Sequence, residues 1–235
     1  MNAFSPDITF DLAQSELREL NGALHKATGE TNAKLWRVLN PNGRHALAAG
    51  VDAPLTIQVE GHVGYYCAGM NQQASIIIHG NAGVGVAENM MSGFVHVLGD
   101  ASQAAGATAH GGMLRIDGNA SARCGISMKG VDIIVKGSIG HMSAFMGQSG
   151  NLIVFGDAGE ALGDSLYEAK LFVRGSVKSL GADCIEKELR DEHKQLLSEK
   201  LAAAGLAGTI DVSEFKRYGS ARRLYNFHID NVDAY

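Results

Sequence analysis

Proline and cysteine are scarce in this chain of 235 residues, which contains three of each. Cys67, Cys124 and Cys184 share no Cys-x-x-Cys spacing. Their odd number argues against the disulfide framework of a small secreted protein. We therefore expect three reduced thiols.

Excess positive charge and long apolar runs are also missing. The formal net charge is −5 and the sequence pI is about 6.0, so no basic face is indicated for nucleic acid or an anionic membrane. Residues 1–10 lack a basic stretch followed by an apolar run, and no apolar segment approaches the roughly 20 residues that cross a bilayer. We expect a cytoplasmic protein with neither nucleic-acid nor membrane partners.

Glycine is abundant, with 30 residues, and it recurs at a fixed interval of 19 positions. We call the glycines in this register the coil glycines and each 19-residue repeat a coil. Seven copies in phase indicate a repeat architecture rather than a bias in composition. The coil glycines are Gly61, Gly80, Gly99, Gly118, Gly137, Gly156 and Gly175.

Aliphatic residues stand four and two positions before every coil glycine. Alternation with period two places both on one face of a strand, and this face is expected to point inward. The first set is Ile57, Ile76, Val95, Leu114, Ile133, Leu152 and Leu171; the second is Val59, Ile78, Val97, Ile116, Val135, Val154 and Val173.

Small residues follow each coil glycine, as a turn requires. A repeat with one strand and no helical pattern cannot bury its own apolar face and must stack on its neighbours. The sequence therefore predicts an all-β core. It is a right-handed, single-stranded parallel β-helix of about seven 19-residue coils over residues 51–183, roughly 30–35 Å long. The residues directly after the coil glycines are His62, Asn81, Asp100, Asn119, Ser138, Asp157 and Ser176.

Both ends of such a rod need covers, because open strand edges promote association. We expect residues 1–50 to form an N-terminal helical cap or arm, with a helix between Ser15 and His25. In the C-terminal segment, residues 184–235, a helix is expected to follow Asp183 and stop at Gly205. Residues 215–235 are interpreted as a docking tail, or as a strip that packs on the protein's own helix.

Apolar residues also occupy outward strand positions, three before the coil glycine, at Ile77, Ile134, Ile153 and Phe172. Solvent alone would favour more charge there. Two explanations stay open: a permanent interface with another protein, or cover by the chain's own flanking helices.

Candidate chemistry is sparse. The glycines of Gly80-Asn-Ala-Gly83-Val-Gly85 recur with the coil, unlike a Rossmann loop that opens a helix. Cys67 and Cys124 lie three coils apart, roughly 14 Å at ~4.8 Å per coil, too far to share a zinc ion. Histidines and acidic residues are scattered, without the paired carboxylates of a carbohydrate-cleaving enzyme. No catalytic, cofactor-binding or metal residue is expected on this chain.

The glycine pattern resembles the GXGXG family. It is seen in Gly80-x-x-Gly83-x-Gly85-x-Ala87 and more loosely around Gly61, Gly137 and Gly156, within residues 51–183. That family includes the C-terminal β-helix of the glutamate synthase large subunit and the β-helix component of formylmethanofuran dehydrogenase. The pattern departs from the family at Ser102, Ser121 and Lys178, where a glycine is expected, so those coils are expected to turn differently.

The flanks narrow the resemblance. Arg18-Glu-Leu-Asn-Gly-Ala-Leu-His25, Asp183-Cys-Ile-Glu and Phe215-Lys-Arg-Tyr-Gly-Ser-Ala-Arg-Arg-Leu-Tyr-Asn-Phe227 resemble stand-alone glutamate-synthase-like subunits of the GlxC type and the β-helix component of N-methylglutamate synthase.

This resemblance implies a non-catalytic structural subunit of a hetero-oligomer in methylamine and glutamate metabolism. It would hold an amidotransferase-like subunit and a synthase-like subunit with FMN and iron–sulfur clusters, with no cofactor on this chain. The alternative is a β-helix subunit of a formylmethanofuran dehydrogenase or formyltransferase/hydrolase complex.

Overall fold

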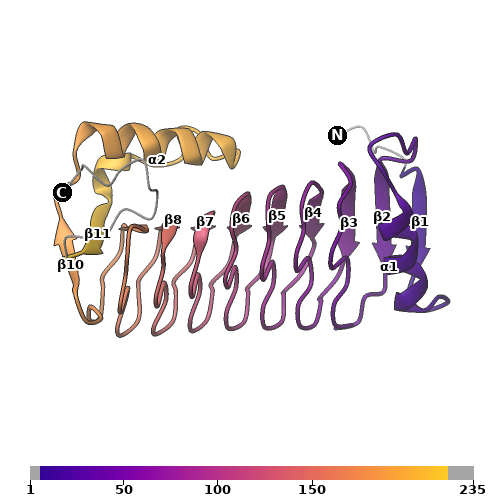
Figure 1. The fold of residues 1–235 in the computed structure, drawn as a ribbon, viewed down its shortest axis with the longest axis horizontal. Coiled ribbons are helices and arrows are strands. Elements are labelled where there is room, and N and C mark those ends of the chain that lie inside the picture. Colours follow the sequence, from indigo (N-terminus) through magenta and orange to yellow (C-terminus); the bar gives the residue numbers. More distant parts are fainter. Residues whose placement is uncertain (1–5, 222–235) are drawn as a thin grey trace, which may run out of the picture.

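The structure is a computed structural model that describes residues 6–221. Its strands form one sheet along a rod, with a helix at each end (Figure 1). The parallel strands are β1 (Ile8–Asp11), β2 (Leu35–Leu39), β3 (Thr56–Glu60), β4 (Ser75–Ile78), β5 (Phe94–Val97), β6 (Met113–Ile116), β7 (Lys129–Val135), β8 (Ser149–Val154) and β9 (Lys170–Val173). They lie in chain order, which confirms the predicted parallel β-helix.

The inward positions predicted from the sequence form the core. Ile57 pairs with Ile76 and Ile76 with Val95, so the ladder advances by one 19-residue coil at each strand. All the aliphatic residues at four and two positions before the coil glycines are fully buried. A second row of parallel bridges, from Val63 through Ala82 and Ala101 to Val177, joins the coils just beyond the coil glycines. The core is therefore a continuous apolar column.

The small polar residue after each coil glycine has a specific partner. Its side-chain acceptor takes a hydrogen bond from the backbone N–H of the same position in the next coil. Asn81 N donates to His62 Nδ1 at 2.9 Å, and Asp100 N donates to Asn81 Oδ1 at 2.9 Å. The column continues through Asn119, Ser138, Asp157 and Ser176. This ladder satisfies backbone donors that the strand pairing leaves over.

Close stacking explains the coil glycines. A Cβ at Gly118 would lie 2.7 Å from the carbonyl oxygen of Gly99 and 2.3 Å from Asp100 Oδ1. A Cβ at Gly80 would lie 2.6 Å from the carbonyl carbon of Gly61. Successive coils approach too closely at this corner for any side chain.

The sheet begins earlier than residue 51. β1 and β2 extend it into the segment expected to be a helical cap, and β2 pairs with β3 in register Trp36 to Ile57. This pairing spans 21 residues, so a period of 19 does not reveal it. The expected helix is present as α1 (Leu17–Lys26), and its Leu20 and Leu24 are fully buried against the end of the core.

The C-terminal segment differs from the prediction at two points. Cys184 does not begin a helix, because it lies in β10 (Cys184–Lys187), and α2 (Asp191–Ala203) starts later. The helix ends as expected, with Gly205 at φ +72°. A short 3₁₀ turn (Val212–Glu214) precedes β11 (Lys216–Ser220).

The docking-tail interpretation is wrong for residues 216–220. They form β11, which joins the sheet between β9 and β10 in antiparallel pairing. The rest of the predicted tail, residues 222–235, lies outside the described residues.

Candidate functional site

The outward apolar residues near the C-terminal end are covered by the chain itself. Ile134, Ile153 and Phe172 are fully buried in a second apolar cluster with Leu197 and Leu201 of α2. Figure 1 shows α2 running along the sheet over this end of the rod. The interpretation of these three residues as an interface with another protein is wrong, and cover by the flanking helix is confirmed. Ile77, on β4, lies outside the cluster and stays partly exposed.

A charged cluster holds the C-terminal end of α2. Arg115 on β6 donates to the carbonyl oxygen of Ala204 at 2.7 Å and pairs with Asp117 at 2.8 Å. His96 Nε2 and Lys136 Nζ lie 3.2 Å and 3.7 Å from the same carboxylate. Burial raises the pKa of Asp117, but hydrogen bonds from Arg115 and His96 outweigh it and leave the pKa below its ordinary value. Burial lowers the pKa of His96 despite its contact with Asp117, so its imidazole is neutral at pH 7.

A second polar row supports the last turn of the helix. Lys200 of α2 lies 2.8 Å from Asp132 on β7, and Asn151 on β8 donates to the same carboxylate at 2.6 Å. The carboxylate of Asp132 therefore joins the helix to the sheet through Lys200 and joins β7 to β8 through Asn151. Asp132 and Lys200 therefore make a structural contact within the chain.

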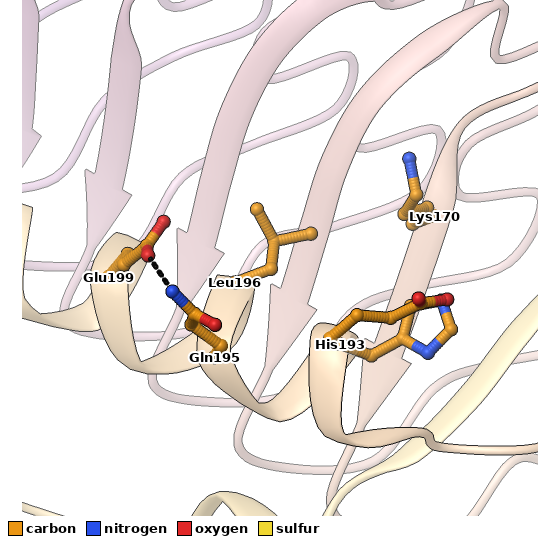
Figure 2. Close-up of a pocket in the computed structure, with 6 residues that line it drawn as sticks. Lys170, His193, Gln195, Leu196 and Glu199 are labelled. Carbon is orange, nitrogen blue, oxygen red and sulfur yellow. Dashed lines mark hydrogen bonds and ion pairs between the residues drawn. The ribbon is translucent and has the colours of Figure 1, made fainter.

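A hollow of about 360 Å³ lies between Lys170 of β9 and the first turns of α2. Figure 2 shows the helix residues on one side of it and Lys170 on the other. His193 is buried, and its Nδ1 accepts a hydrogen bond from the backbone N–H of Arg190 at 3.1 Å. Burial, followed by the nearby Arg217, lowers its pKa, so the neutral ring carries its proton on Nε2. Besides Lys170 and His193, the lining residues are Glu192, Gln195, Leu196 and Glu199, which include no hydroxyl or thiol nucleophile.

A second hollow, of about 280 Å³, lies on the turns of the first coils and is here named the Tyr66 hollow. Tyr66 and Met70 are 49% and 54% exposed, which is unusual for such large apolar side chains. This site was missed from the sequence, because the predictions followed the strand positions. The signal was present in the same repeat, as a pair of large apolar residues where several other coils carry small or polar ones. The lining residues are Ala46, Ala49, Tyr66, Gly69, Met70, Glu88 and Asn89.

All three cysteines lie in the apolar core. Cys67 and Cys124 are fully buried, and burial raises the pKa of each thiol to about 12. Cys184 is buried in β10, where burial raises its pKa to about 11. Thiols with such pKa values stay protonated at neutral pH and are poor nucleophiles and metal ligands.

Across residues 6–221, no group of three or more His, Cys, Asp or Glu side chains is placed to hold a metal ion. Within the same part of the chain, no helix has the length and apolar character needed to cross a membrane. That this chain carries no catalytic or cofactor-binding residue stays a prediction.

Comparison with known proteins gives a relative over nearly the whole chain. No family model matches the sequence, and no solved structure matches it. A curated protein from Rhizobium meliloti (strain 1021), Protein GlxC, is 64% identical over 225 residues, which cover 96% of this chain and 98% of that protein. The GlxC part of the resemblance seen in the flanks is thereby confirmed. The chain belongs to the GlxC family.

Proposed function

We propose that this chain is a non-catalytic scaffold subunit of a glutamate-synthase-like complex of the N-methylglutamate synthase type. The observation that carries the proposal is the unbroken 19-residue register from β3 to β9. Each coil is fixed to the next by strand pairing and by the ladder of side chains after the coil glycines. Together, these contacts make β3 to β9 a rigid spacer of about 30 Å, at ~4.8 Å per coil.

The partners in this proposal are an amidotransferase-like subunit and a synthase-like subunit with FMN and iron–sulfur clusters. Iron–sulfur clusters are held by cysteine thiolates. Cys67, Cys124 and Cys184 do not fit this role, because they are buried and their pKa values of about 11 to 12 keep them protonated. Transfer of methylamine-derived nitrogen to glutamate would take place on the flavin subunit, and this chain would fix the distance between the partners.

Charged residues between the outer sheet face and α2 support a structural role. Arg115, Asp117, Asp132 and Lys200 are engaged in binding α2 to the sheet. Placing general acid–base chemistry on these groups would require breaking the contacts that hold the helix. The turns of the coils stay open beside these contacts, and they suit contacts with other subunits.

Native mass spectrometry of the untagged complex from its host tests the proposal, with flavin and iron measured on every chain that travels with this one. The expected result is a larger partner with flavin and iron, together with an amidotransferase-like chain. The isolated chain should form no N-methylglutamate from glutamate and methylamine. Turnover by the isolated chain, or a metal-dependent hydrolase as the partner, would overturn the proposal; the second result would point to a formyl-transferring complex.

A further inference from the structure

The aromatic residues beside the Tyr66 hollow are held in place by the next coil. A Cβ at Gly83 would lie 3.0 Å from Tyr65 Cδ1, and a Cβ at Gly85 would lie 2.7 Å from Tyr66 Cδ1. Both tyrosine rings therefore lie over glycines of the Gly80-x-x-Gly83-x-Gly85 motif. On the other side, His45 stacks on Tyr65 with ring centroids 4.4 Å apart. The rings form an ordered surface, so less side-chain entropy is lost when a partner binds.

Other coils show what the fold itself needs at these positions. At the position of Tyr66, the next five coils carry Gly85, Ala104, Arg123, Met142 and Ala161; at that of Met70 they carry Asn89, Thr108, Ser127, Met146 and Ser165.

The backbone is the same at these repeated positions. It is left-handed at Tyr66 (φ 59°), Ala104 (φ 59°) and Arg123 (φ 59°) alike. The coil therefore requires neither a ring nor a thioether there. Tyr65, Tyr66 and Met70, each about half exposed, are grouped on neighbouring positions and offer apolar area that a partner can bury.

The charge at the hollow selects the partner's chemistry. Glu88 is the charged side chain among the lining residues, and within residues 6–221 no ion pair reaches it. Its Oε2 atom would lie 2.7 Å from a Cβ at Gly85, the same point that Tyr66 Cδ1 approaches. A carboxylate held beside a tyrosine ring is partly desolvated and favours a cation on the bound surface.

We propose that the Tyr66 hollow is the docking site for a neighbouring subunit, which inserts a large apolar side chain flanked by a lysine or arginine that pairs with Glu88. This inference rests on the proposed function, because it assumes that the scaffold has a protein partner. It adds which surface binds that partner and by what chemistry. Apolar anchors in pockets, with a charge pair at the rim, are the common form of such contacts.

The test uses substitutions to residues that other coils already carry at the same positions. The variant Tyr66→Ala with Met70→Ser installs what other coils carry at the same positions, so the coil should fold. The matched control, Arg123→Ala with Ser127→Ala, changes the same two positions three coils away. In host cells, the first variant should lower the fraction of chain recovered with its partner by more than about tenfold, and the control should leave it unchanged. Urea unfolding midpoints check that both variants fold.

Glu88→Lys should weaken assembly as well, and Glu88→Gln should weaken it less. A photoreactive amino acid in place of Met70 should cross-link a partner peptide that contains an apolar residue next to lysine or arginine. Equal recovery of folded wild type and the Tyr66 and Met70 variant would overturn this inference and leave the proposed function standing. A wild-type chain without any partner would overturn the proposed function itself. Cross-links only between copies of this chain would show that the hollow binds a second copy and overturn the inference.

Discussion

Arg115 joins two parts of the chain that are 89 residues apart, because its Nη1 donates to the carbonyl oxygen of Ala204 at 2.7 Å. Ala204 is the C-cap of α2, directly before Gly205 turns the chain. A cation at this end also compensates the negative pole of the helix. The same guanidinium pairs with Asp117, directly after β6, so one side chain contacts both the end of this strand and the end of the helix.

Replacing Arg115 should loosen α2 from the sheet. Arg115→Gln removes a charge-assisted hydrogen bond to Ala204 and a largely buried ion pair with Asp117, and we expect a loss of about 2 kcal/mol in the free energy of unfolding. Urea denaturation measures the loss, and hydrogen exchange should show faster exchange in α2. The exposed Arg123 serves as the control, and Arg123→Gln should change neither. Unchanged exchange in α2 would contradict the assigned role of Arg115.

Ile153 should behave as a core residue and not as an interface residue. It is fully buried beneath α2, so Ile153→Ala should lower the free energy of unfolding by about 2–4 kcal/mol, through lost transfer energy and a cavity. Ile77 stands at the same coil position on β4, beyond the helix, and Ile77→Ala should cost clearly less. Equal losses in urea denaturation would show that the helix does not cover Ile153 in solution.

The core could be predicted from the sequence because its signal is local and repeated. Ile57 and Val59 alternate on one strand, and each later coil repeats the pair at the same spacing. β2 was missed because Trp36 pairs with Ile57 across 21 residues. β10 and β11 were missed for a different reason: Cys184 pairs with Ser220, and neither strand is periodic by itself. Their pairing depends on contacts that only the folded end of the rod supplies.

The candidate sites show the same contrast between local signals and contacts that form only on folding. The outward positions of Ile134, Ile153 and Phe172 were predicted, yet their cover depends on where α2 lies, which the sequence left open between two explanations. The Tyr66 hollow could be found only by looking for differences between coils at the same position. Its large side chains stand out only when they are compared with the smaller residues at the same positions of other coils, such as Ala104 and Thr108.

Asp157 should make the stability of the rod depend on pH in the acid range. Its carboxylate accepts hydrogen bonds from the backbone N–H and hydroxyl of Ser176, which hold its pKa below the ordinary value. Since the folded-state pKa is lowered, the contribution is present above the unfolded-state pKa of about 3.9 and is lost as pH falls through the folded-state pKa.

Asp157→Asn keeps an acceptor, as Asn81 and Asn119 do at the same position, but removes the titration. Its urea midpoint should therefore fall less than that of the wild type between pH 6 and pH 3. Parallel profiles for Asp157→Asn and the wild type would contradict the prediction.

Gly118→Ala tests whether the coil glycines exist for close stacking. The added Cβ would lie 2.7 Å from the carbonyl oxygen of Gly99, so the two coils must separate, and we expect a loss of about 2–3 kcal/mol in the free energy of unfolding. Gly29→Ala is the matched control, because no atom lies within 4 Å of its Cβ. It should be neutral or slightly stabilising. If Gly118→Ala were equally neutral in urea denaturation, close stacking would not explain the coil glycine at this position. Backbone conformation would not explain it either, since the φ of Gly118 is not in the left-handed region that favours glycine.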